Sequence, residues 1–218
     1  MARPDVPFTE ALLLLGRYYE SYVGRADPTV VLELRVRLRQ AKFLYEQAME
    51  VHDRLWDAQK QPNDEEEGVQ RVAIHTEPYD QLPQLPPGLI ATIFGDQPFA
   101  EDEAVRTYAE SFYYIAHRIL VVLRQCGAGL PGVGRVRAEG VGRVRNNVLE
   151  HSNKPGGNQI VSTVISVSGP RLGSLRRASA PASFNDAGLP DNACEFVTSL
   201  IDALKSALQE AGDPEPAG

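Results

Sequence analysis

Residues 27–60 read DPTVVLELRVRLRQAKFLYEQAMEVHDRLWDAQK, and this stretch decides the fold class. Asp27 is a suitable N-cap, and Pro28 suits the first position of a helix. Apolar or semi-apolar side chains then recur at alternating steps of three and four, which predicts one helix of about 30 residues. These side chains belong to Val31, Leu34, Leu38, Ala41, Tyr45, Ala48, His52 and Leu55.

The regular spacing in this helix has two interpretations. A sustained heptad is typical of a coiled-coil dimer, but it also arises on the core face of a long helix in a bundle. Because Ala, Tyr and His are poor residues for a coiled-coil seam, the sequence favours the core face. Both interpretations predict that this face is hidden from water.

The rest of the chain predicts more helices and one hairpin. A run of β-branched residues predicts a strand over 159–168, and the turn at Gly169-Pro170 leads into a returning strand near 171–177. The expected fold is therefore mainly α, a bundle of about five helices with a small β-hairpin (159–178) inserted before the C-terminal helix. Apolar stripes at helical spacing place the other helices at 7–23, 99–125, 144–151 and 191–211.

The sequence predicts a single domain over residues 1–211, with two long loops and a disordered tail at 212–218. Prolines punctuate the first loop, 61–98, which cannot hold a long helix. The second, a Gly/Arg loop over 127–143, contains the hexapeptide Gly-Val-Gly-Arg-Val-Arg, which begins at residue 132 and again at residue 140. Its glycine pattern follows a helix rather than a strand and includes a proline, so it is not a dinucleotide-binding fingerprint.

Composition and charge exclude several classes of function. The chain has 218 residues, of which 43% are hydrophobic and 23% charged, and its net charge is −7. Binding to nucleic acid or a membrane through bulk charge is not expected, so any phosphate contact needs a local basic site. Two cysteines make no disulfide framework, and no apolar run reaches the length of a membrane span, which favours a cytoplasmic protein.

The sequence also predicts no metal or cofactor site. The four histidines do not pair at ligand spacing, and there is no Cys-x-x-Cys motif. A phosphate-binding Walker loop and a nucleophile elbow are likewise missing. Any chemistry must therefore come from side chains that work without a metal.

One motif remains, Arg145-Asn146-Asn147-Val148-Leu149-Glu150-His151. It resembles the signature of the HEPN superfamily of small helical domains, in which an arginine and a polar residue, often asparagine, precede a histidine. Arg145, Asn146 and His151 match this pattern, with five residues between the arginine and the histidine. The order of elements, long helices first and the motif on a late helix, is similar too, and the motif looks like that of uncharacterised bacterial members.

The resemblance implies a function for these residues. Many members of the superfamily are metal-independent ribonucleases of a defence or toxin type, and their site usually forms across a homodimer. Carried over by position, His151 would be the acid/base, Arg145 the group that stabilises phosphate charge, and Asn146 a positioning group. Possible RNA contacts are Arg135, Arg137 and Arg143 upstream. The implied partners are RNA, a second copy of the chain and a protein antitoxin or other operon partner, with no membrane.

A different class of function stays open. The chain would then be a non-catalytic helical module for protein–protein interaction, favoured by the heptad of 31–55 and the acidic charge. In that case Arg145 and Glu150 make surface contacts, Asn146 or Asn147 caps the helix, and His151 interacts with the dipole of the helix end.

Overall fold

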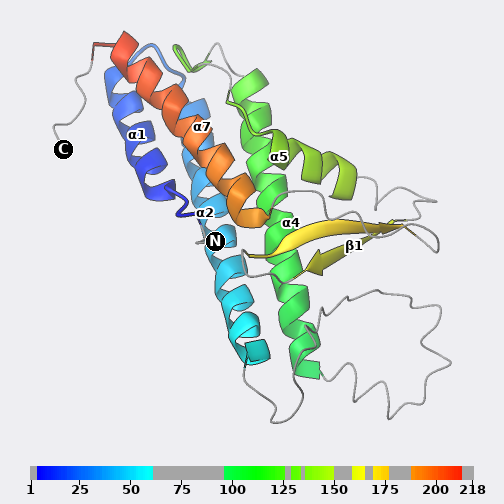
Figure 1. Ribbon diagram of the computed structural model, residues 1–218. Coiled ribbons are helices and arrows are strands. Elements are labelled where there is room, and N and C mark those ends of the chain that lie inside the picture. The colour runs from blue at the N-terminus through cyan, green and yellow to red at the C-terminus, as the bar shows by residue number, and fades with distance from the viewer. Residues whose placement is uncertain are drawn as a thin grey trace, which may run out of the picture.

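The computed structural model describes residues 4–60, 96–125, 129–133, 136–149, 159–164, 169–176 and 188–212. Over these residues the predicted mainly α fold is confirmed (Figure 1). The expected tail lies outside them beyond residue 212, as do residues 61–95 of the first expected loop. That loop ends earlier than predicted, because residues 96–98 already belong to the next helix.

Two long helices pack against each other in the bundle. Helix α2 (Pro28–Lys60) runs antiparallel to α4 (Asp96–Gln125), and the two pack along much of their length. At the start of α2, Oδ1 of Asp27 accepts a hydrogen bond of 2.8 Å from the backbone N–H of Thr29, so the predicted cap is present. The second pair, α1 (Phe8–Ser21) and α7 (Leu189–Glu210), lies side by side in the same direction.

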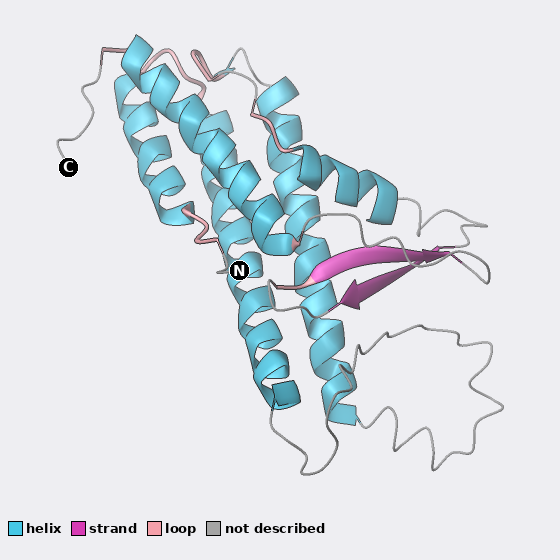
Figure 2. Ribbon diagram, in the orientation of Figure 1, coloured by secondary structure: helices cyan, strands magenta, loops and turns pink. Residues whose placement is uncertain are grey.

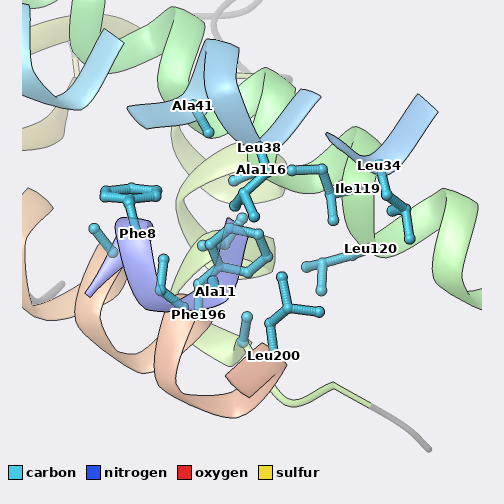
Figure 3. Packing of buried hydrophobic residues seen from close by; sticks show 14 of the residues in the cluster. Phe8, Ala11, Leu34, Leu38, Ala41, Ala116, Ile119, Leu120, Phe196 and Leu200 are labelled. Carbon is cyan, nitrogen blue, oxygen red and sulfur yellow. The ribbon is translucent and has the colours of Figure 1, made fainter. Parts of the chain in front are cut away.

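The heptad of α2 faces the core. Leu34 is 3% exposed, Ala41 0% and His52 0%, and the other heptad positions are buried or half-buried. In Figure 3 the side chains of Leu34 and Leu38 enter the core from one side, and Leu200 of α7 enters from the other. The core-face interpretation of the heptad is therefore correct, and the heptad carries no evidence for a coiled-coil seam.

The β-hairpin is present where it was predicted. Strands β1 (Gln159–Val164) and β2 (Arg171–Arg176) pair antiparallel, with Gln159 opposite Arg176 and Val164 opposite Arg171. Figure 2 shows the hairpin at one side of the helices, where both strands contact α4. Leu172 of β2 is 4% exposed, so the hairpin adds an apolar side chain to the core.

The expected Gly/Arg loop 127–143 is shorter and better anchored than the sequence suggested. Residues 139–143 form a short helix, α5 (Glu139–Arg143), so the loop prediction is wrong there. Upstream, Leu130 is 1% exposed, and the hydroxyl of Tyr18 donates a 2.8 Å hydrogen bond to the carbonyl of Pro131. Sequence periodicity did not reveal this anchor, because it rests on a single leucine and on polar contacts with α1.

Candidate functional site

The Arg145–Asn146 pair lies on a π-helical turn. Helix α5 continues without a break into the π-helix η3 (Val144–Leu149), which contacts α4 and β2. Val144 and Leu149 are five residues apart and are 1% and 2% exposed. The i→i+5 turn of a π-helix brings positions five apart onto one face, whereas an α-helix would separate them by about 140°. Burial of these two side chains is thus a local reason for the π geometry.

Two polar residues of this turn, Arg145 and Asn146, contact each other. Arg145 is half-buried, and its Nη1 donates a hydrogen bond of 3.0 Å to Oδ1 of Asn146, which is exposed. Arg143 and Arg137 are exposed on the same segment. A guanidinium recognises phosphate through donors held in a fixed geometry. The contact with Asn146 therefore orients the Arg145 guanidinium, a group suited to binding an anion.

The structure corrects the expected position of Asn146. The sequence interpretation that Asn146 or Asn147 caps the helix is wrong, because both lie inside the continuous helix that begins at Glu139. The N-cap position is Ala138, whose side chain makes no capping hydrogen bond.

A side chain of helix α7, rather than that of Ala138, caps α5. The carboxylate of Glu195 accepts hydrogen bonds from the backbone N–H of Glu139 at 3.1 Å and of Gly140 at 3.3 Å. A carboxylate at a helix N-terminus satisfies free backbone donors and complements the helix dipole. One turn further along α7, Oγ of Ser199 accepts a 2.7 Å hydrogen bond from the N–H of Arg137. These contacts fix the direction in which α5 and η3 leave the bundle.

Close packing reinforces the junction between α5 and α7. Gly140 lies so near Asn192 that a Cβ on the glycine would overlap the amide oxygen of Asn192. Asn192 is 2% exposed, and its Nδ2 donates a 2.9 Å hydrogen bond to the hydroxyl of Tyr113 on α4. The candidate turn is therefore held by both α7 and α4.

Sequence reasoning missed the residues that support the turn. Glu195 and Ser199 resemble ordinary solvent-facing positions of an amphipathic helix, and no local pattern marks them. Asn192 was expected at the start of the last helix, but this helix begins at Leu189, after Gly188, and Asn192 faces the core. Little in the sequence indicated that Asn192 is buried, because an asparagine just before the apolar positions of a helix is normally interpreted as a cap.

The structure brings together only part of the expected site. His151 and Arg135 lie outside the described residues, so the distance from Arg145 to the expected acid/base is not defined. Over residues 136–149 three arginines stand against one glutamate, a local excess of positive charge in an acidic chain. Arg171, the first residue of β2, adds an arginine on a strand that contacts η3.

Within the described parts of the chain, no three His, Cys, Asp or Glu side chains gather in a way that could hold a metal ion. The helices described there also contain no segment that is both long and apolar enough to cross a membrane. Comparisons with protein-family models, with curated proteins and with solved structures give no significant match to this chain.

Proposed function

We propose that this protein is a HEPN-like, metal-independent endoribonuclease of the cytoplasm, of a bacterial toxin or defence type. The observation that supports the proposal is the half-buried guanidinium of Arg145, oriented by Asn146 at 3.0 Å on a π-helical turn. π-turns are rare and occur frequently at functional sites. The turn also lies in a locally cationic segment of a chain whose net charge is −7, as a local phosphate site requires.

The proposed reaction uses the nucleophile that RNA itself carries. The 2′-hydroxyl loses its proton to a base and attacks the adjacent phosphorus. A P–O2′ bond forms, the bond to the 5′-oxygen breaks, and that oxygen leaves with a proton. The products are a 2′,3′-cyclic phosphate and a 5′-hydroxyl. His151 is the proposed acid/base, because the pKa of a histidine lies near neutrality.

The arginines have the remaining roles in the proposed reaction. Negative charge builds on the non-bridging phosphate oxygens in the transition state, and Arg145 would stabilise it with donors that need little reorganisation. Asn146 would hold the guanidinium in place, while Arg137 and Arg143, with Arg135, would bind neighbouring phosphates. Sequence-independent phosphate contacts of this kind would make RNA affinity fall as salt rises.

The proposal is tested with a short RNA labelled at one end and the purified full chain. Arg145→Ala and His151→Ala should each lower the cleavage rate by about 10²–10⁴, the range typical for loss of an acid–base or oxyanion-stabilising group. Both variants should keep the helical circular dichroism spectrum. Arg54→Ala, on the exposed side of α2, is the matched control and should cleave like the parent. Cleavage should persist in EDTA and stop when the 2′-hydroxyl at the cut site is removed.

A second candidate function is a non-catalytic interaction module, and one observation favours it. Leu32, Val36 and Phe43 are exposed on α2, at 60%, 43% and 56%. Exposed apolar clusters mark protein-binding surfaces. If the parent chain leaves the RNA intact, or if its cleavage is unchanged in His151→Ala, the ribonuclease proposal is wrong and the interaction module replaces it.

A further inference from the structure

A groove of about 640 Å³ lies between the start of α1 and the middle of α2 (Figure 1). Residues 4–9 form one wall and residues 42–50 of α2 form the other, and we call this space the α1–α2 groove. Sγ of Cys194 on α7 lies 4.0 Å from the carbonyl oxygen of Asp5 and donates a weak hydrogen bond to it, which helps to hold the first wall. The volume is within the range of small-molecule sites, about 300–1,000 Å³.

The floor of the α1–α2 groove is apolar and partly aromatic. Phe8 and Met49 line the groove and are 2% and 7% exposed, so they lie at its base. Tyr45 lies beside Phe8, with the two ring centroids 5.6 Å apart and the ring planes inclined at 47°. Such a floor can cover the hydrocarbon part of a ligand, and aromatic rings also attract a cation that lies over a ring face.

The rim of the α1–α2 groove is acidic. Asp5, Glu46 and Glu50 are exposed there, and Lys42 is the basic side chain that lines the same groove. Three carboxylates and one ammonium group give the groove a net charge of −2. Lys42 pairs with Glu46 at 3.4 Å, and Gln47 donates a hydrogen bond of 3.2 Å to Glu50. Like charges one helical turn apart are unfavourable for a helix, but here they create a negative potential beside an apolar floor.

We propose that the α1–α2 groove binds a small organic cation, a primary ammonium group joined to an apolar body. The ammonium group lies among the three carboxylates of the rim, and the apolar body lies on Phe8, Tyr45 and Met49. The charge of the rim selects a cation over an anion. Among the described side chains no three acidic groups converge closely enough to hold a bare metal ion, so the floor must contribute to binding.

The α1–α2 groove is distinct from the Arg145 turn. Residues 4–9 and α2 form the groove, whereas α7 holds the turn through Glu195. The two places also have opposite charge, since the segment around Arg145 is locally cationic and the groove is acidic. The inference therefore does not rest on the proposed ribonuclease function, and its test needs no RNA.

Isothermal titration calorimetry of the full chain with 2-phenylethylammonium tests the site. Binding should be saturable with one ligand per chain. The Tm should rise with ligand concentration, because the groove exists only in the folded chain. Two related compounds separate the contributions of charge and ring. 2-Phenylethanol lacks the charge and methylammonium lacks the ring, so each should bind at least about tenfold more weakly.

Substitutions on α2 test where the ammonium group lies. Glu46→Gln and Glu50→Gln should each weaken binding by about three- to tenfold, because each removes a negative charge beside the ligand. Lys42→Gln should strengthen binding by a similar factor, since it removes a like charge and leaves the Glu46 carboxylate to the ligand. Glu20→Gln, at an exposed position of α1 outside the groove, is the matched control and should bind like the parent.

The opposite effects of the glutamate and lysine variants are the decisive result, because a general attraction of cations to an acidic chain would change as much in Glu20→Gln. An absence of saturable 2-phenylethylammonium binding would overturn the proposal. Equal affinity for 2-phenylethanol would overturn it too, since the carboxylates would then have no role. The same holds if Glu46→Gln and Glu50→Gln both keep the parent affinity and the parent circular dichroism spectrum.

Discussion

Replacing Gly140 by alanine tests the junction on which the candidate site depends. Alanine is the better helix former by about 1 kcal/mol, so propensity alone predicts a more stable α5. The structure predicts the opposite. A Cβ at Gly140 would overlap Oδ1 of Asn192 and lie 3.1 Å from Oε2 of Glu195. Asn192 is buried, so its side chain can move only by breaking its hydrogen bond to Tyr113.

The magnitude follows from these contacts. Overpacking a close contact costs about 1–3 kcal/mol, and a buried hydrogen bond left broken costs about 1–3 kcal/mol more. After the helix-propensity gain of about 1 kcal/mol is subtracted, the free energy of unfolding should fall by roughly 1–5 kcal/mol. At about 2–4 °C per kcal/mol for a chain of this size, that corresponds to a decrease in Tm of roughly 2–20 °C.

Gly142 provides the matched control for this substitution. It lies in the same short helix, and a Cβ there would have no neighbour within 4 Å. Gly142→Ala should therefore raise stability by up to about 1 kcal/mol. Urea and thermal unfolding followed by circular dichroism measure both variants. The penalty at Gly140 should shrink in an Asn192→Ala background, because the colliding atom is then missing. If Gly140→Ala is as stable as Gly142→Ala, α5 does not pack on α7 as described.

Two further predictions concern the tyrosines at the end of α1. Tyr22→Phe removes a buried 2.8 Å hydrogen bond to the carbonyl of Ala207, so it should cost about 1 kcal/mol in urea unfolding, while Tyr19→Phe, at an exposed position, should cost nothing measurable. Burial, with a smaller effect of Tyr22, raises the pKa of Tyr18 from 10.0 to about 12, against an opposing effect of Arg25. Because the unfolded chain then releases this proton at lower pH than the folded chain, stability should fall as pH rises from 10 to 12, and Tyr18→Phe should show a smaller fall. Equal pH slopes for the parent and Tyr18→Phe would contradict the burial of this hydroxyl.

The sequence predicted the long elements of the fold because their signals are local and repeated. The α2 heptad contains eight positions in register, and their burial follows from helical periodicity alone. The hairpin was predictable for a similar reason, since a run of β-branched residues precedes a Gly-Pro turn. The end of α2 at Lys60 also agrees with the prediction, whereas α7 begins at Leu189, two residues before its predicted start at residue 191.

The candidate site was less predictable, because its support comes from distant parts of the chain. The motif identified Arg145 and Asn146, but nothing near them indicated a π-turn or a cap supplied by Glu195. The cap joins residues 56 positions apart, a separation at which a pattern in one segment carries no information about the other. The exposed apolar residues Leu32, Val36 and Phe43 of α2 were missed for another reason. They are only three positions in a helix whose periodicity is dominated by the eight positions of the heptad.

The duplicated hexapeptide shows why local sequence was not sufficient in this region. In the first copy Gly132 has φ of 78°, a left-handed conformation in a turn, whereas in the second copy Gly140 lies in the first turn of α5. The first glycine of the hexapeptide thus has a different backbone conformation in each copy, and the contacts around each glycine determine that conformation. The chain turns at Gly132 where Tyr22 and Ala207 close the space around it, while Gly140 enters a helix because Glu195 binds its N–H. A hexapeptide with weak preferences takes its conformation from the surface on which it packs, and that surface is α7 for both copies.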